Sequence, residues 1–597
     1  MSAGLPGALL ALGLAIAATA SAAKIGGEFP FPPESEEVLL RVPEGRTPES
    51  ALARSVERAR QLIDEGQLLL ASGLLERAVA EAPDAAELRL SLAQLYARLG
   101  RHEDALRIAE ALRAADPEAA APYAVLGGVY LRRGEVEQAV AAYEKLALRA
   151  PRDASAHERL GDALHPRDPK AALQRYERAL ALEPKRVSAL ARSAVVLAEL
   201  GRAREAAQRA QHALALREDD SLALLALGNA RRAQGQLDAA EQVYRRALSS
   251  APDYSPFTLR LAELLRERGR TGPAIEILEA LLERAPDARP AHELLAQLYG
   301  ESGDAARREL SLGRLALASR ERGEAVRHFE AALAANPELD DAALELAALE
   351  LAEGKIDGAA ARLAVLLEAG RASVRAELLQ GHVAVSRGDL KGAEAAYRRA
   401  LESEPADPAA HLALARLLAR TRRCGDALKS YAEATLRGAA SASVHSERAA
   451  CHVEHGELAL AETAFRSALA SDPEHVDALS GLAWVYLRSG RSPDLAGFLS
   501  ERALALRPDD AHLHYALGRA RLAAGRNAEA AEELEAALAR QPDHPALLHF
   551  LGAARLALGE RDEARRRLER VLEVAPGYAQ AAAVREMLEQ IEAAPGT

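Results

Sequence analysis

The sequence predicts an all-α superhelical solenoid of stacked helix pairs, and three observations support this fold class. Proline returns at intervals of 33 to 35 residues, or at multiples of that period with one exception, along most of the 597-residue chain, which is typical of a repeat architecture. Apolar residues recur at helical spacing, and no segment alternates as a strand does. The chain is also too long for one globular core. The recurring prolines are Pro83, Pro117, Pro151, Pro184, Pro252, Pro286, Pro337, Pro405, Pro473, Pro508, Pro542 and Pro576.

Each period contains two amphipathic helices with a glycine-bearing turn between them. The first helix presents an apolar residue, a small residue and an aromatic or leucine side chain on one face, and the second presents alanines around a large side chain. Proline ends the second helix because it has no N–H to donate and clashes with the preceding turn. In the clearest repeat these residues are Leu126, Gly127, Tyr130, Gly134, Ala139, Tyr143, Leu146 and Pro151.

This pattern resembles the tetratricopeptide repeat. About 14 or 15 such units fit between Ser50 and Pro576, followed by a terminal helix from about Tyr578 to Ala593. The resemblance implies a right-handed superhelix in which neighbouring helix pairs share a continuous core. It also implies that the first helix of each repeat lines a concave groove that binds peptides or partner helices.

One irregularity divides the predicted arrays. The interval from Pro286 to Pro337 is 51 residues, or one and a half periods. Residues 288–302 and 305–319 both have the pattern of a first helix, so one helix is expected to lack a partner. Either a degenerate repeat within a continuous stack or a kink between two arms explains this spacing. We therefore predict an N-terminal array over 48–303, a C-terminal array over 304–577, and a capping helix and tail over 578–597.

The N-terminal segment has the composition of an export signal. Residues 1–22 are small or apolar, and Ala18-Thr19-Ala20 suits a signal peptidase, although no lysine or arginine precedes the apolar run. A cleaved signal peptide is the preferred interpretation. A retained N-terminal anchor and a cytosolic start are the alternatives. Residues 23–47 contain four prolines without helical periodicity, which predicts an extended tether.

Charge and motifs argue against several function classes. The net charge of −12 is spread along the chain without a basic stripe, so nucleic acid is not an expected partner. Phosphate-binding loops, nucleophile elbows and HExxH motifs are absent from the sequence. His445, Cys451, His452 and His455 lie close together in sequence, but only two of them share a helix face, whereas zinc needs three or four converging ligands. We expect no catalytic residues, no cofactor and no metal.

The two cysteines of the chain are Cys424 and Cys451. Cys424 lies in a turn between helices, and Cys451 lies in the first helix of the next repeat. Packed neighbouring repeats bring such positions together, and an exported chain permits oxidation. A disulfide between them is one hypothesis, and two separate thiols are the alternative.

Aromatic residues mark the candidate binding groove. Trp484 is the only tryptophan, and Tyr515 and Phe550 occupy groove positions in the next two repeats. Exposed aromatics often anchor partners, so we predict a groove formed by Trp484, Arg488, Tyr515, Arg519 and Phe550. The alternative is that Trp484 packs against a neighbouring helix. The residues that follow the small position of each first helix, and therefore face the groove, are Gln94, Gly128, Asp162, Val195, Asn229, Glu263, Gln297, Arg314, Ala348, His382, Arg416, Ala450, Trp484, Arg519 and Ala553.

These features together predict a non-catalytic scaffold that binds proteins or peptides. Similarity to exported tetratricopeptide proteins implies a role in the bacterial periplasm or cell envelope, in polysaccharide export, pilus or outer-membrane assembly. The first alternative is a cytosolic or inner-membrane-anchored adaptor, in which the membrane is met only through the N-terminal segment. The second is a carbohydrate-modifying enzyme, which the lack of a recognisable catalytic domain disfavours. The sequence predicts neither the partner nor the oligomeric state.

Overall fold

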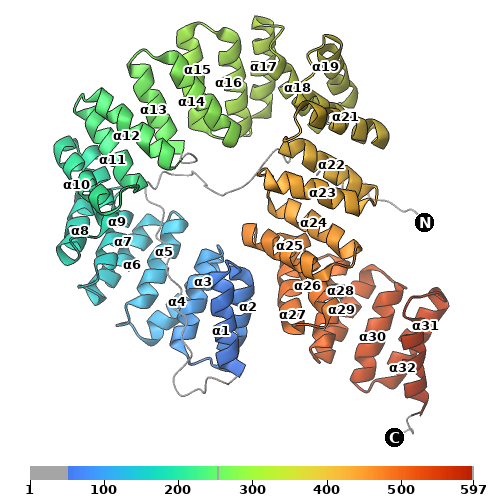
Figure 1. The fold of residues 1–597 in the computed structure, drawn as a ribbon. Helices are drawn as coiled ribbons and strands as arrows, with labels where there is room; N and C mark the ends of the chain where they lie inside the picture. The colour runs from blue at the N-terminus through green and yellow to red at the C-terminus, as the bar shows by residue number, and fades with distance from the viewer. Residues whose placement is uncertain (1–50, 252–254, 594–597) are drawn as a thin grey trace. The chain divides into compact units, whose positions relative to one another are not determined.

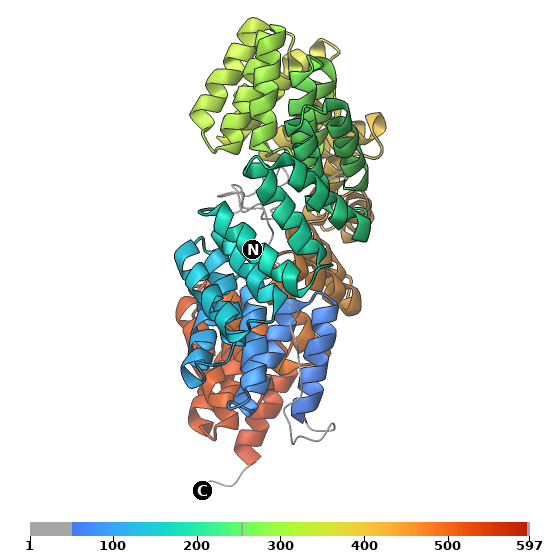
Figure 2. The ribbon, with the colours of Figure 1, turned by 90° about the vertical axis from the view of Figure 1, so that its left-hand side faces the viewer.

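The computed structural model describes residues 51–251 and 255–593, and all regular structure within these ranges is α-helical. Within each of two parts of the chain, described below, consecutive helices pack against one another as antiparallel neighbours (Figure 1). The view in Figure 2 shows the same arrangement from the side. The predicted all-α solenoid of helix pairs is therefore confirmed. None of the helices in the described ranges has the length and apolarity required to cross a bilayer.

The chain forms two compact units. Among the described residues, the first unit spans 89–389 and the second combines 51–88 with 390–593. The helices of the first unit are α3 (Ala86–Arg98, which begins in the second unit), α4 (His102–Ala115), α5 (Ala121–Arg132), α6 (Val136–Arg149), α7 (Ala154–Leu164), α8 (Pro169–Leu182), α9 (Val187–Glu199), α10 (Ala203–Leu216), α11 (Ser221–Ala233), α12 (Leu237–Ser250), α13 (Ser255–Glu267), α14 (Thr271–Arg284), α15 (Arg289–Ser302), α16 (Ala305–Ala318), α17 (Arg322–Ala335), α18 (Asp340–Ala352), α19 (Ile356–Glu368) and α20 (Val374–Ser386).

The second unit includes the first two helices of the chain together with its C-terminal helices. These helices are α1 (Ala51–Asp64), α2 (Leu68–Glu81), α21 (Leu390–Ser403), α22 (Pro408–Arg420), α23 (Cys424–Leu436), α24 (Ala442–Glu454), α25 (Leu458–Ser471), α26 (Val476–Ser489), α27 (Pro493–Leu506), α28 (Ala511–Ala523), α29 (Asn527–Arg540), α30 (Pro545–Ala557), α31 (Arg561–Val574) and α32 (Ala581–Ala593).

In several helix pairs, a small residue of the first helix packs directly against an aromatic ring of the second. Gly228 of α11 lies so close to Tyr244 of α12 that a Cβ on the glycine would stand 2.3 Å from the ring. Tyr244 is fully buried, and its hydroxyl donates to Asn229 Oδ1 at 2.6 Å. Gly235 turns the chain between the two helices with φ of 73°, a conformation that glycine adopts without steric cost. The repeat pattern in the sequence thus translates directly into interhelical packing.

The half-repeat is accommodated by a helix with two partners. α16 packs against both α15 and α17, so it serves as the second helix of one pair and the first helix of the next. Before it, odd-numbered helices contact each other across repeats, as α9, α11, α13 and α15 do; after it, even-numbered helices do, as α18 and α20 or α26 and α28. The expectation of an unpaired helix is therefore wrong, because both faces of α16 are covered.

Several predictions about organisation remain predictions. Residues 1–22 and 23–47, interpreted as a signal peptide or anchor and a tether, lie outside the described residues. The proposed array boundary at 303/304 falls in the turn between α15 and α16, inside the first unit. The kink hypothesis for 286–337 is likewise left as a prediction.

Candidate functional site

Trp484 lies on α26 and is partly exposed, so it does not belong to the buried core. Arg488 follows one helical turn later, and its Cζ atom stands 5.5 Å from the centre of the Trp484 ring. The contact is a cation–π interaction. α26 therefore presents an aromatic face and a guanidinium group together.

Tyr515 and Arg519 form the same arrangement on α28. Arg519 Cζ is 5.5 Å from the Tyr515 ring centre and 4.7 Å from that of Phe550 on α30. The two rings contact each other edge to face, with centroids 5.8 Å apart. Both are partly buried against the apolar core formed by α29 and α30, so the guanidinium is held between two supported aromatic faces. The structure thus brings Tyr515, Arg519 and Phe550 into direct contact.

Two further residues extend this cluster beyond the sequence prediction. His549 stacks on Phe550 with centroids 4.8 Å apart, and its Nδ1 lies 3.3 Å from the Tyr578 hydroxyl. The Tyr578 hydroxyl in turn contacts Gln580 Oε1 at 3.2 Å. Burial lowers the pKa of His549 below its usual value; a hydrogen bond with Gln580 opposes this shift and nearby Arg519 adds to it, so the neutral form is favoured at pH 7. Arg519 therefore supplies the positive charge of the cluster.

Equivalent positions in other repeats carry a carboxylate where this cluster has a ring. Arg314, Arg416 and Arg519 occupy the same groove position, and each contacts the residue 31 places later. For Arg314 that residue is Glu345, with Nε to Oε1 at 2.9 Å. For Arg416 it is Glu447, with Nε to Oε2 at 2.9 Å. For Arg519 it is Phe550, so the arginine is held by a ring in place of a counter-ion.

Two arginines of the first unit are each paired with a glutamate of the next repeat. Arg232 pairs with Glu263 at 2.8 Å, and Arg266 contacts Glu301 at 2.9 Å. These Arg–Glu pairs lie between first helices of adjacent repeats and use the charges that would otherwise meet a ligand. An arginine already bonded to a carboxylate has less to offer an acidic partner.

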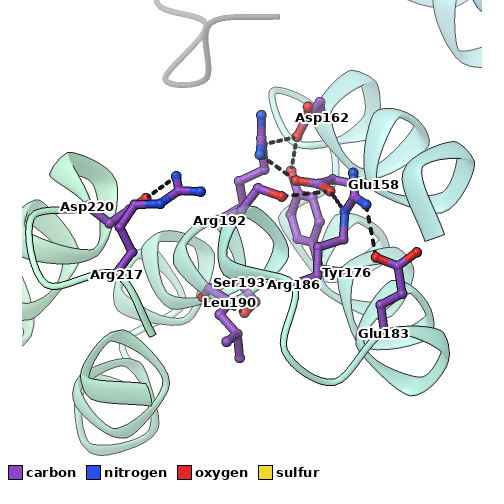
Figure 3. A network of polar contacts seen from close by, with 11 residues as sticks. Glu158, Asp162, Tyr176, Glu183, Arg186, Leu190, Arg192, Ser193, Arg217 and Asp220 are labelled. Atoms are coloured by element: carbon purple, nitrogen blue, oxygen red, sulfur yellow. Dashed lines mark hydrogen bonds and ion pairs between the residues drawn. The ribbon is translucent and has the colours of Figure 1, made fainter. Parts of the chain in front are cut away.

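A buried network of charged side chains joins α7, α8 and α9 (Figure 3). Glu158 is 1% exposed and accepts hydrogen bonds from Arg192 and Arg186. Arg192 also contacts Asp162 at 3.0 Å, and the hydroxyl of buried Tyr176 donates to Asp162 Oδ1 at 2.8 Å. Because each polar group meets a partner of opposite character, the network holds adjacent repeats together.

Arg488 and Arg519 are different, since no carboxylate within the described residues forms an ion pair with either of them. Their neighbours are the partly exposed rings of Trp484, Tyr515 and Phe550. Guanidinium groups are able to pair with anions, and aromatic rings are able to pack against apolar side chains.

Models of the tetratricopeptide repeat match segments distributed along most of the chain. One matches residues 62–124, 100–160, 231–298 and 521–588, and another matches 193–255, 378–443 and 449–494. A related repeat-like domain matches 282–409. The chain belongs to the tetratricopeptide repeat family. Tetratricopeptide repeat proteins typically act as non-catalytic scaffolds that bind other proteins or peptides.

Solved structures with tetratricopeptide repeats are similar over parts of the chain. The Cut9–Hcn1 hetero-tetramer of the APC/C is 17% identical, with a TM-score of 0.37 over 79% of this chain and 96% of that chain. PilW, a type IV pilus biogenesis factor, is 19% identical, with a TM-score of 0.33 over 35% and 98%. Yeast Tom70 is 17% identical, with a TM-score of 0.28 over 69% and 96%. With such low scores, these likenesses carry no argument about function. No curated protein matches the chain.

The two cysteines of this tetratricopeptide repeat protein are both buried and free. Cys424 begins α23, and its thiol donates to Glu454 Oε2 at 3.1 Å. Burial raises the pKa of the Cys424 thiol, and the neighbouring Cys451 thiol raises it further. Burial raises the pKa of the Cys451 thiol as well, so both thiols favour the protonated form at neutral pH and react slowly. The disulfide between them stays a prediction.

The described ranges contain no group of three or more histidine, cysteine or acidic side chains arranged to hold a metal ion. His452, considered above as a ligand-type residue, instead contacts Glu457 through Nδ1 at 2.7 Å. The candidate site is thus the set of aromatic rings and guanidinium groups on α26, α28 and α30.

Proposed function

We propose that this protein is a scaffold whose C-terminal groove binds a partner segment carrying acidic and apolar side chains. The groove consists of Trp484, Arg488, Tyr515, Arg519 and Phe550. The observation that carries the proposal is the substitution of Phe550 for the glutamate found at Glu345 and Glu447. This substitution leaves Arg519 without an internal counter-ion while a ring keeps it in place.

The energetics favour an anionic ligand at this position. An arginine that pairs with a ligand carboxylate in a partly desolvated groove forms a charge-assisted hydrogen bond, which is stronger than a neutral one. The rings beside it bury apolar ligand surface at the same time. Acidic segments are expected to avoid the first unit, because Arg232 and Arg266 already contact carboxylates there.

Selection from a random peptide library displayed on phage, with the full chain immobilised, tests this proposal. We expect enriched peptides to contain aspartate or glutamate next to an aromatic or aliphatic residue. The Phe550→Glu variant places a carboxylate beside Arg519, as Glu447 stands beside Arg416, and should weaken binding of a selected peptide roughly tenfold or more. Isothermal titration calorimetry measures this change.

The matched control is Arg416→Ala, which removes an arginine that Glu447 already neutralises. This variant should bind the selected peptide with the affinity of the unmodified chain. Equal affinity of the unmodified chain and the Phe550→Glu variant, or enrichment of basic peptides, would contradict the proposed groove.

We further propose that the scaffold works in the bacterial cell envelope. The support is the apolar, alanine-rich composition of residues 1–22 and the small residues around Ala20. Mass spectrometry of the protein purified from its native cells should find a mature chain that starts at Ser21 or Ala23. Recovery of the chain with residues 1–20 intact would instead favour the anchored or cytosolic adaptor.

A further inference from the structure

α2 is covered on more sides than a second helix of a repeat normally is. Seven consecutive residues, Leu69–Leu75, are all buried. In α12, which occupies the equivalent position of its repeat, burial is confined to Ala240, Glu241, Tyr244 and Ala247. A helix that is apolar all round is buried all round. The greater burial of α2 therefore requires cover beyond what the repeat stack gives to α12.

The second cover comes from the C-terminal part of the same unit. α2 contacts α25 and α27. Gly73 lies against the ring of Phe498 on α27, so closely that a Cβ on Gly73 would stand 2.8 Å from the ring. A glycine within a helix is less favourable than an alanine. Here its lack of a side chain makes room for the Phe498 ring.

Two ion pairs flank this contact. Arg77, one turn after Gly73, pairs with Asp494, one turn before Phe498, at 3.0 Å. The register is therefore antiparallel between α2 and α27. Arg466 of α25 contacts Glu65, which precedes α2, and these two residues are 401 positions apart in the sequence. At the centre of the contact, the Phe498 ring fits against Gly73. At its edges, two ion pairs fix the alignment of the helices.

We propose that the outer surface of α25 and α27 is a docking site for the hairpin of α1 and α2, which acts as a reversible clasp within one chain. Its committed occupant is residues 51–81 of the same molecule. The ion pairs are partly exposed, so they add little energy and weaken with salt. The seat of Phe498 over Gly73 therefore carries most of the specificity. α25 and α27 meet α2 at one ring-to-glycine contact that is flanked by two partly exposed ion pairs, so the clasp can open while the repeats stay folded.

Electron paramagnetic resonance tests the clasp in the full chain. Spin labels at Glu81→Cys and Arg491→Cys report on it, because the antiparallel register places these exposed positions near each other and the native cysteines are buried. We expect one short distance. Gly73→Leu raises the helix propensity of α2, so it should not unfold the helix. The leucine side chain would occupy the space of the Phe498 ring. We therefore expect the ratio of open to closed clasp to rise about tenfold.

A second variant shows whether Gly73→Leu acts by blocking the Phe498 ring or by disturbing α2 itself. Phe498→Ala added to Gly73→Leu removes the obstructed ring and should restore the short distance. The matched control is Ala80→Leu, an exposed position of the same helix, which should change nothing. An unchanged distance in Gly73→Leu, or failure of Phe498→Ala to restore it, would overturn the clasp. Loss of the short distance on dilution with unlabelled chain would show docking on a second copy and would also overturn it.

Discussion

Replacing Arg192 by alanine is expected to destabilise α7, α8 and α9 by about 3 kcal/mol. Glu158 is 1% exposed and would keep a buried charge after losing a principal partner. Asp162 would lose its contact with Arg192 as well. Arg186 still donates to Glu158, so the expected loss lies toward the lower end of what the breaking of a buried ion pair costs.

Hydrogen exchange measured by mass spectrometry on the full chain checks this result, because repeat arrays open locally and a single global unfolding energy is not defined. Amides of 154–199 should exchange faster in Arg192→Ala, while those of the second unit should be unaffected. Arg202→Ala serves as the control, since its pair with Glu205 is exposed and such pairs contribute about 0–1 kcal/mol. Equal effects of the two variants would show that burial of the network is unimportant.

Gly228→Val should destabilise the pair of α11 and α12 by about 3 kcal/mol. The new Cβ would stand 2.3 Å from the ring of Tyr244, which is fully buried and held by its hydrogen bond to Asn229. Because the ring is fully buried, it can move away only by displacing the side chains around it, and we expect the two helices to separate instead. Exchange of amides in 221–250 measures the loss.

Gly272→Val provides the comparison at a glycine in the same unit. No atom lies within 4 Å of the position its Cβ would take, so the substitution should change local stability by less than about 0.5 kcal/mol. If Gly228→Val were equally mild, the close approach of the helices would not be what holds a repeat together.

Much of the fold could be predicted from the sequence because each repeat is a local unit. Leu126, Gly127 and Tyr143 are close enough in the chain for their spacing to reveal a helix pair. The pairing of α16 with two helices could not be predicted, because its first-helix pattern indicates the contact with α17 but not the contact with α15. The contact of Gly73 with Phe498 joins segments far apart in sequence, and only the leucine-rich composition of α2 gave any signal of it.

The candidate groove was predicted in part. Trp484, Tyr515 and Phe550 could be placed on it by counting along the repeats. The cluster's extension to His549 and Tyr578 depends on packing between α30 and the segment before α32, which spacing does not reveal. The decisive feature is that Phe550 stands where other repeats have Glu345 or Glu447. The sequence does not reveal which residue each of these arginines contacts, so the importance of Phe550 depends on the structure.

Hydrogen exchange of the full chain, measured with and without a selected acidic peptide, tests whether the C-terminal groove is the binding site. If the groove built from Trp484, Arg519 and Phe550 is the binding site, peptide binding should slow exchange in α26, α28 and α30, and Phe550→Glu should abolish that protection. Protection confined to the first unit, or protection that persists in Phe550→Glu, would contradict it.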